Sequence, residues 1–394
     1  MSSPVEQAID PLSEVNWQLL ADDLKSALMP LANGKQLGVL RLHAPSKLNA
    51  LSLTMVKGIG EQLTAWADDD SVVAVWLDGE GEKAFCAGGD IVDMYHAMKA
   101  RPNQIQNEVR DFFTLEYTTD HQIHTYSKPI VVWGDGIVMG GGIGLLAGAS
   151  HRLVTERSRL AMPEISIGLY PDVAGTWFLP KMPNKAGLFL GLTGAQINGS
   201  DAVYLGMADH RIGSENMHAL MHCLSELPWQ GDASDFGMLS ASLDKLTLPS
   251  QAPDLSLPMG YLAHQQQVSQ LCQGDSLADV VEDILKTPCD EDEVWLSRAK
   301  ANLKAGSPVT AHIVWQVMQQ PPHSLADAFR QELGLSCRCA ESGEFAEGVR
   351  ALLVDKDRDP KWLYPDINAV PPSVIEHYFD SPWAEQQHPL RDLA

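Results

Sequence analysis

The chain has 394 residues, of which 45% are hydrophobic and 20% are charged, and its formal net charge is −23. This composition is typical of a globular protein and not of a disordered chain. The negative charge disfavours a nucleic-acid or anionic-membrane partner, because both require a basic surface. Apolar runs are shorter than the ~20 residues of a membrane span. The N-terminal segment lacks a basic region followed by an apolar region, so we expect a cytoplasmic protein.

Strand and helix patterns alternate through the first half of the chain. Each predicted strand is a buried or alternating apolar run, and each predicted helix has apolar residues at three- and four-residue steps. The stripe of the first helix comprises Leu53, Val56, Ile59, Leu63 and Trp66. Predicted strands cover 37–43, 71–79, 128–136, 151–156 and 159–164, and predicted helices cover 52–70, 90–100, part of 102–126 and 140–148. This alternation predicts an α/β fold.

After about residue 184 the strand-like runs end and amphipathic helical stretches follow one another. They cover 214–227, 275–287, 291–305, 308–319, 324–340 and 344–354, with a loop at 248–258. We therefore expect an N-terminal extension at 1–36, an α/β core at 37–184 and a mainly helical region at 185–394.

Two glycine-rich turns stand between a strand and a helix. They are AFCAGGD at 84–90 and VMGGGIGLLAG at 138–148. Glycine lets the backbone expose N–H groups there, and the start of a helix favours negative charge. A nicotinamide dinucleotide site is not expected, since Ala147 stands where the G-x-G-x-x-G fingerprint needs its third glycine.

Three carboxylates lie in apolar surroundings. Glu116 falls on the apolar stripe of the long helix, so it needs a partner or a function. Glu164 and Asp172 flank a Tyr-Pro turn in the stretch PEISIGLYPD. If a turn brought both carboxyls to one pocket, burial and their mutual repulsion would separate their pKa values. One would then serve as an acid and the other as a base at neutral pH. A buried salt bridge at Glu116 and simple capping at Glu164 and Asp172 remain the structural alternatives.

No metal is expected from the histidines and cysteines. The six cysteines include no CxxC pair, and they are too sparse for a disulfide framework. His218 and His222 stand one helical turn apart but lack the glutamate of HExxH.

Together these motifs resemble the crotonase (enoyl-CoA hydratase/isomerase) superfamily. AFCAGGD and VMGGGIGL resemble its two oxyanion-hole segments, and APSKLNALS resembles its CoA-binding loop. Within it, FFTLEY, AMPEISIGLYPDVAGTWFLP and EFAEGVRALLVDKDRDPKW resemble the 3-hydroxyisobutyryl-CoA hydrolase family, which has a helical C-terminal extension. The resemblance implies a spiral core of repeated strand-strand-helix units with a helical C-terminal region. It also implies an acyl-CoA substrate and a place in valine breakdown.

The resemblance also assigns roles to residues. The N–H groups of Gly89 and Gly141 would stabilise the thioester oxyanion. Glu164 would activate water, or attack to form a mixed anhydride, and the sequence leaves both open. Asp172 would orient the substrate's hydroxyl or handle the proton of the leaving thiolate, and Glu116 would line the acyl pocket.

The resemblance also suggests which basic residues would bind CoA. Lys47, with Arg41 or Lys83, would meet the CoA phosphates. No cofactor is implied, because CoA is part of the substrate, and a homo-oligomer is a candidate assembly.

One departure from the hydratases separates the candidate activities. Hydratases carry a first glutamate shortly after the triple glycine, and here that position is Gly144. This favours thioester hydrolysis with Glu164 and Asp172 as the carboxylates. Hydration or isomerisation with Glu164 as base, and CoA-ester binding without turnover, are the alternatives.

Overall fold

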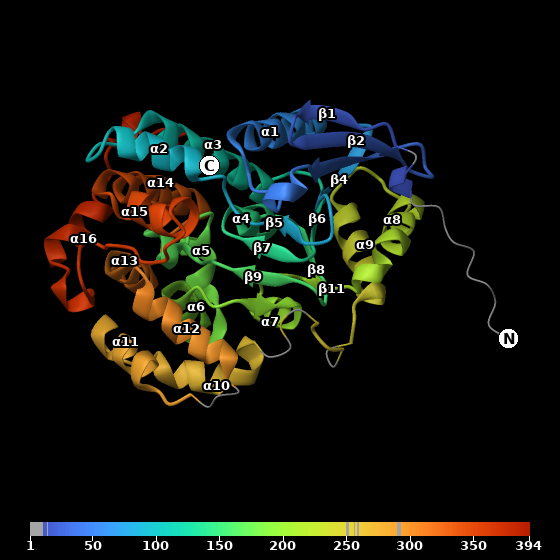
Figure 1. The fold of residues 1–394 in the computed structure, drawn as a ribbon. Coiled ribbons are helices and arrows are strands. Elements are labelled where there is room, and N and C mark those ends of the chain that lie inside the picture. The colour runs from blue at the N-terminus through green and yellow to red at the C-terminus, as the bar shows by residue number, and fades with distance from the viewer. Residues whose placement is uncertain (1–10, 14, 250–251, 256, 258–259, 290–292) are drawn as a thin grey trace.

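The computed structural model describes residues 11–13, 15–249, 252–255, 257, 260–289 and 293–394. Its core holds a seven-stranded and a four-stranded sheet, with helices around them (Figure 1). The larger sheet has the order β1 (Gln18–Ala21), β2 (Leu24–Pro30), β3 (Gln36–Leu42), β4 (Val72–Gly79), β6 (Ile130–Gly134), β8 (His151–Val154) and β11 (His210–Arg211). The smaller has the order β10 (Ile197–Asn198), β9 (Arg159–Ala161), β7 (Ile137–Met139) and β5 (Ala84–Cys86).

The chain alternates between the two sheets. β4, β6 and β8 lie in the larger sheet, and the strand that follows each of them, β5, β7 or β9, lies in the smaller one. Helices follow each pair, so the core repeats a strand-strand-helix unit. Buried β-branched and aromatic residues along β4 and β6 suit a sheet covered on both faces. The predicted α/β fold with a spiral core is therefore confirmed.

The first four helices lie close to where the sequence predicts them: α1 (Leu53–Ala67), α2 (Val92–Ala100), α3 (Asn107–His124) and α4 (Gly141–Ala147). Three short helices that the sequence did not predict follow: α5 (Gly175–Phe178), α6 (Ala186–Thr193) and α7 (Gly199–Tyr204). Ser52 caps α1 by accepting a hydrogen bond from the Met55 N–H. The predicted stripe of α1 is buried except for Leu53, which is 48% exposed. That part of the prediction is wrong, because Leu53 is the first residue of the helix.

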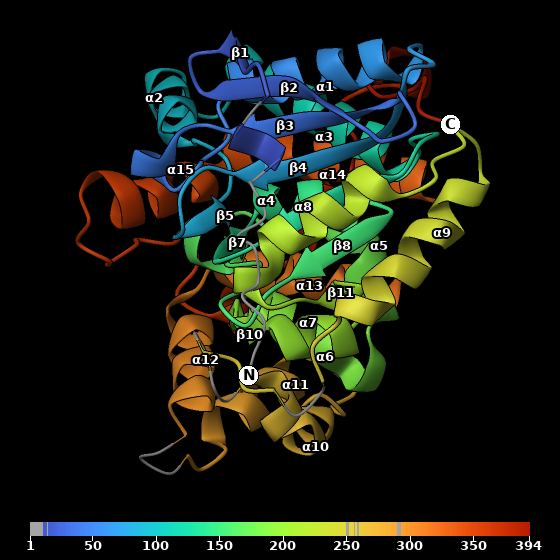
Figure 2. The same cartoon turned by 90° about the vertical axis from the view of Figure 1, so that its right-hand side faces the viewer.

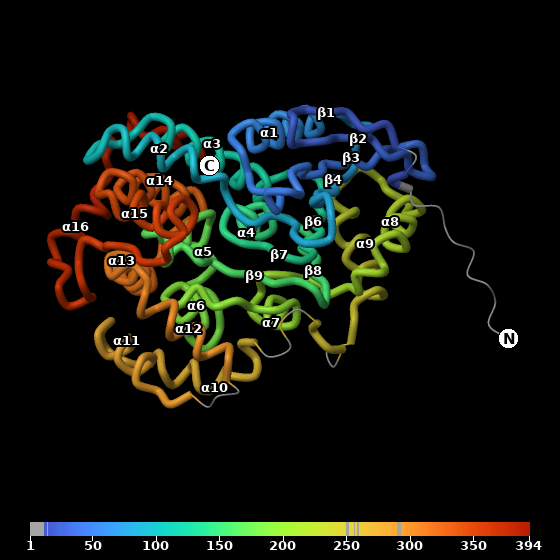
Figure 3. Tube along the Cα trace, viewed as in Figure 1, coloured from blue at the N-terminus to red at the C-terminus, as the bar shows by residue number. Residues whose placement is uncertain are grey.

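Nine further helices follow in the described part of the chain. They are α8 (Met217–Glu226), α9 (Ser234–Leu243), α10 (Tyr261–Leu271), α11 (Leu277–Lys286), α12 (Val294–Ala305), α13 (Pro308–Gln319), α14 (Leu325–Ser342), α15 (Glu344–Val349) and α16 (Pro372–Phe379). Helices α8 and α9 pack on the larger sheet (Figure 2), whereas α10–α16 gather on the other side of the molecule (Figure 3). Helix α14 packs along α3. None of the described helices is long and apolar enough to cross a membrane.

Two expectations need adjustment around the core. Strands β10 and β11 lie in the segment where only helices were expected; each has two residues, too few for a visible alternation. Within the expected N-terminal extension, β2 pairs with β3 along its whole length. Residues 1–10 of that extension, parts of the 248–258 loop and the start of the 291–305 helix lie outside the described residues. The six cysteines are free.

Candidate active site

The smaller sheet brings the motifs together. Its strands β5, β7 and β9 run parallel to one another, so their carboxyl ends lie at one edge. The turn with Gly89 follows β5, the turn with Gly141 follows β7, and Glu164 follows β9. Three motifs that are far apart in the sequence thus meet at one place.

The glycine turns leave two N–H groups available. Gly88 has φ +108° and Gly140 has φ +49°, conformations that suit glycine. A Cβ on Gly88 would lie 3.8 Å from the Gly141 nitrogen, so the two turns are adjacent. In the described part of the chain, the N–H groups of Gly89 and Gly141 donate to no acceptor. Gly141 is the first residue of α4, where N–H groups lack partners within the helix.

Glu164 faces the second glycine turn. A Cβ on Gly140 would lie 3.2 Å from Glu164 Oε1. The Glu164 side chain is buried, and within the described residues its Oε2 has no hydrogen-bond partner. Burial, together with the charge of Asp172, raises the pKa of Glu164 well above its ordinary value. A carboxyl in this state is a strong base once it is ionised.

Asp172 is joined to helix α3. The Tyr117 hydroxyl donates to Asp172 Oδ2 at 2.6 Å, and the Tyr117 oxygen lies 2.7 Å from Ser336 Oγ on α14. Burial raises the pKa of Asp172 to about 6, although the hydrogen bond from Tyr117 lowers it. The sequence did not point to Tyr117 or Ser336, because both act through contacts across the fold.

Glu116 lies against α4. A Cβ at Gly141 would overlap Glu116 Oε1, so the glycine makes room for the carboxyl. Burial first, and then the charge of Asp120, raise the pKa of Glu116 well above its ordinary value. The prediction of a buried carboxylate on the helix stripe is confirmed, and no ion pair satisfies it within the described residues.

Asp120 is a further buried carboxyl of the site. It stands one helical turn after Glu116, and neither of its oxygens has a partner among the described residues. A Cβ on Gly144 would lie 2.6 Å from Asp120 Oδ2. The Asp120 carboxyl thus fills the space beside the position where hydratases carry a glutamate. Extending the α3 stripe by one turn would have found it from the sequence.

Of the three basic residues expected to bind CoA, two pair with carboxylates and the third is exposed. Lys47 is 67% exposed at its side chain and pairs with Asp90 at 2.8 Å. Arg41 makes a two-pronged contact with Asp78, at 2.7 and 2.6 Å. Lys83 is exposed. None of the three lines the cavity described next.

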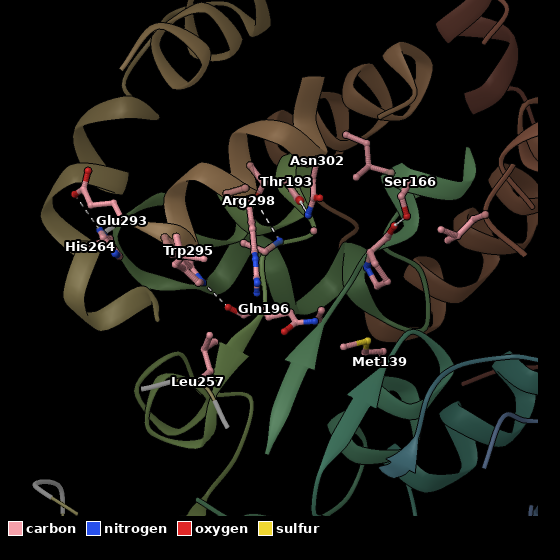
Figure 4. Close-up of a pocket in the computed structure, with 18 of the residues that line it drawn as sticks. Met139, Ser166, Thr193, Gln196, Leu257, His264, Glu293, Trp295, Arg298 and Asn302 are labelled. Carbon is pink, nitrogen blue, oxygen red and sulfur yellow. Dashed lines mark hydrogen bonds and ion pairs between the residues drawn. The ribbon is translucent and has the colours of Figure 1, made fainter. Parts of the chain in front are cut away.

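A cavity of about 690 Å³ opens beside the site. Met139 and Pro163, the chain neighbours of Gly140 and Glu164, line its inner end. Residues 193–196 and helix α12 form the opposite wall (Figure 4), and Leu352 and Arg358 complete it.

The cavity wall carries cations and aromatic rings. Arg298 and Arg358 form no ion pair within the described residues, in a strongly acidic chain. The His264 ring stacks on Trp295 with centroids 5.1 Å apart and planes 9° apart. Trp295 Nε1 donates to the Gln196 carbonyl at 2.5 Å, which fixes the ring. Sequence reasoning missed these residues because they come from the helical half. No group of three or more His, Cys, Asp and Glu side chains in the described residues is arranged to hold a metal.

Comparison with known proteins identifies the family. The model of the enoyl-CoA hydratase/isomerase family matches residues 37–379. The chain is 37% identical to 3-hydroxyisobutyryl-CoA hydrolase, mitochondrial, of Danio rerio, over 94% of both chains. It is also 33% identical to small ribosomal subunit protein mS47 of Neurospora crassa, over 86% of this chain and 69% of that protein.

Two solved structures share the fold. An enoyl-CoA hydratase from Rhodobacter sphaeroides 2.4.1 is 31% identical with a TM-score of 0.75, over 91% of this chain and 97% of that one. A carnitinyl-CoA dehydratase from Mycobacterium thermoresistibile is 34% identical with a TM-score of 0.75, over 91% and 96%.

The names of these relatives correct the expected location and confirm the expected family. The hydrolase relatives from Danio rerio, Mus musculus and Xenopus tropicalis are all named as mitochondrial, which contradicts the expected cytoplasmic location. An N-terminal segment without targeting features was too weak a signal for location. The similarity to hydrolases and hydratases over nearly the whole chain confirms the expected family. The chain belongs to the enoyl-CoA hydratase/isomerase family, the crotonase superfamily, and within it to the branch of the 3-hydroxyisobutyryl-CoA hydrolases.

Proposed function

We propose that the protein hydrolyses the thioester of 3-hydroxyisobutyryl-CoA, or of a related 3-hydroxyacyl-CoA, to the free hydroxy acid and CoA. The observation that carries the proposal is the buried Glu164 carboxyl, which faces a glycine turn while Gly144 offers no second glutamate. Among the described residues, its Oε2 has no hydrogen-bond partner and the N–H groups of Gly89 and Gly141 donate to no acceptor. The name of the Danio rerio relative supports the same substrate. Release of the hydroxy acid would belong to valine breakdown.

The N–H groups of Gly89 and Gly141 form the proposed oxyanion hole. Both would donate to the thioester oxygen, which gains negative charge as the carbonyl carbon is attacked. Fixed donors stabilise this charge without reorganising, and each donor in such a site is worth about 3–4 kcal/mol. The start of α4 lies behind Gly141 and adds the favourable end of its dipole.

Glu164 is the proposed base or nucleophile. As a base, it would take a proton from water while the water oxygen bonds to the carbonyl carbon. As a nucleophile, Glu164 would form a mixed anhydride, which water then cleaves. In both routes the C–S bond breaks and the thiolate takes a proton. The raised pKa of Glu164 makes its ionised form a stronger base and nucleophile, although burial disfavours that form.

Asp172 and Glu116 are the proposed partners of the acyl group. Asp172 has a pKa of about 6 and would be largely ionised at neutral pH, so it can accept a hydrogen bond from the substrate's hydroxyl. Glu116, whose pKa burial also raises, would line the acyl pocket and position the substrate's hydroxyl. A buried acceptor of this kind disfavours acyl groups without a hydroxyl, because it would then remain unpaired.

The cavity beside Met139 and Pro163 is the proposed site of the CoA moiety. Its unpaired Arg298 and Arg358 could meet phosphate groups, for which arginine is well suited. The largely buried His264–Trp295 stack lines the same cavity and could contact a base there. Lys47, Arg41 and Lys83 lie outside this cavity, and their contact with the CoA phosphates stays a prediction.

Two other functions remain as outcomes of the test. The solved relatives named as a hydratase and a dehydratase favour addition of water to a double bond. The ribosomal relative shows that this sequence family includes a protein named for a structural assembly.

The deciding experiment measures free thiol from 3-hydroxyisobutyryl-CoA and from crotonyl-CoA with the wild type and Glu164→Gln. We expect thiol release from the hydroxy ester, and a loss of about 10²–10⁴-fold in the variant, the usual range for a general base. Hydration of crotonyl-CoA without thiol release would contradict hydrolysis. Binding of both esters without turnover would instead support a non-catalytic role. Thermal unfolding confirms that the variant is folded.

A further inference from the structure

Glu332 reaches from the C-terminal half to the turn that follows Asp172. It lies on α14 and is completely buried. Its Oε2 accepts from the Ala174 N–H at 2.9 Å, and its Oε1 accepts from the Thr176 N–H at 3.0 Å and the Thr176 hydroxyl at 2.6 Å. The Glu332 side chain thus accepts three hydrogen bonds from this turn.

The turn needs such support because its backbone is in an unfavourable conformation. Val173 has φ +49° and Ala174 has φ +70°, in the left-handed region. A β-branched residue there is a real outlier, and it persists only where its surroundings enforce it. The bonds to Glu332 begin at Ala174, directly after Val173. They therefore hold the turn at the place where it would otherwise relax.

Helix α14 is also linked to the side chain of Asp172, through Tyr117. Ser336, one turn after Glu332, has its Oγ 2.7 Å from the Tyr117 oxygen and 3.0 Å from the Tyr170 oxygen. Tyr117 in turn donates to Asp172 Oδ2. The backbone after Asp172 and the carboxylate of Asp172 are therefore both fixed to the same helix.

The hydrogen bonds around Glu332 need side-chain oxygens that accept. All three partners donate, and a carboxylate only accepts, whereas glutamine would place its own N–H₂ group against a backbone N–H. We propose that Glu332 is a positioning residue that holds Asp172 in its reactive place, and that this is what the helical C-terminal region contributes to the reaction. The proposal rests on the hydrolysis proposed above.

The first test is Glu332→Gln. We expect kcat to fall about 10- to 100-fold, since small misplacements of reacting groups have effects of this size. KM for the acyl-CoA should change little, because Glu332 does not line the cavity. The acidic limb of the pH profile should move to higher pH, because loosening the turn weakens the hydrogen bond from Tyr117 that lowers the pKa of Asp172. An unchanged kcat and pH profile would overturn the proposal.

A second pair of variants dissects the contact. Thr176→Val removes one hydrogen bond to Glu332 and should lower kcat less than Glu332→Gln does. Thr176→Ser keeps the hydroxyl and should retain most of the activity. Equal loss in both variants would contradict the proposal, because the hydroxyl that only Thr176→Ser keeps would then have no effect.

The matched control is Asp201→Asn. Asp201 is likewise buried and accepts backbone N–H groups, from Tyr261 at 2.9 Å and Leu262 at 2.8 Å. Within the described residues it makes no hydrogen bond with the turn after Asp172. We expect it to lower thermal stability and leave the pH profile unchanged.

Hydrogen exchange separates this proposal from the proposed function. In Glu332→Gln the amides of Ala174 and Thr176 should exchange faster than in the wild type. If the wild type hydrolyses no acyl-CoA, the proposed function fails. The exchange of the Ala174 and Thr176 amides in Glu332→Gln then decides separately on Glu332. Unchanged exchange would overturn its positioning role, and faster exchange would support Glu332 as the group that holds the turn.

Discussion

The Tyr117 hydroxyl donates a hydrogen bond of 2.6 Å to Asp172 Oδ2, and this contact joins the long helix α3 to the loop that carries the second carboxylate. Glu116 precedes Tyr117 on the same helix and packs on Gly141. One turn of α3 therefore contacts both the proposed oxyanion hole and Asp172.

Replacing Tyr117 by Phe removes this donor and leaves the ring. Because the hydrogen bond lowers the pKa of Asp172, its loss should raise that pKa above about 6. We expect the acidic limb of the hydrolysis profile to move up by about one pH unit, corresponding to about 1.4 kcal/mol. The measurement is kcat against pH. A limb that stays in place would show that Asp172 does not set it.

Gly141→Ala tests the close approach of α4 to Glu116. The added Cβ would overlap Glu116 Oε1, so the carboxyl or the helix must move. We expect destabilisation of about 1–3 kcal/mol, as in overpacked cores, together with a loss of kcat.

The control for this change is Gly237→Ala on α9. Gly237 has no heavy atom within 4 Å of an added Cβ. Alanine there should stabilise the helix by about 0.5–1 kcal/mol and leave kcat unchanged. Urea unfolding and turnover of both variants check the pair. Equal changes in stability and kcat for Gly141→Ala and Gly237→Ala would contradict the close contact between Gly141 and Glu116.

Arg298→Ala and Arg358→Ala test the proposed CoA site. Each should raise KM for 3-hydroxyisobutyryl-CoA about tenfold, consistent with about 1.5–3 kcal/mol for a hydrogen bond to a charged group. KM for the N-acetylcysteamine thioester of the same acid should not change, because that ester lacks the nucleotide. Arg391→Ala, in a pair with Asp392, is the control. Equal KM changes for both esters would place the arginines away from the CoA phosphates.

Stability should depend on pH through the buried carboxyls. The pKa of Glu332 is about 8 against an ordinary value of 4.5, so between these values the folded state binds more protons than the unfolded state. Folding stability therefore falls as the pH rises through this range. We expect a shallower decline in Glu332→Gln, measured by urea unfolding at several pH values from 5 to 8. The same slope in both proteins would contradict the raised pKa.

The sequence by itself determined the local elements and pointed to the candidate residues of the site. Periodicity located α1, α3 and β4, and the apolar surroundings of Glu116, Glu164 and Asp172 singled out these acids, whereas the choice of Gly89 and Gly141 within the glycine turns came from the family resemblance. These signals are local, since glycine freedom and a carboxylate on an apolar stripe can be read within a few residues.

Only the tertiary structure decided which distant residues complete the site. Glu332 stands 156 positions after Thr176, and no pattern within α14 links the two residues. Arg298 and Arg358 look like ordinary surface charges until the fold places them on one cavity. Such contacts depend on how α12 and α14 pack on the core, and burial across the whole chain determines that packing, not the propensity of any one segment.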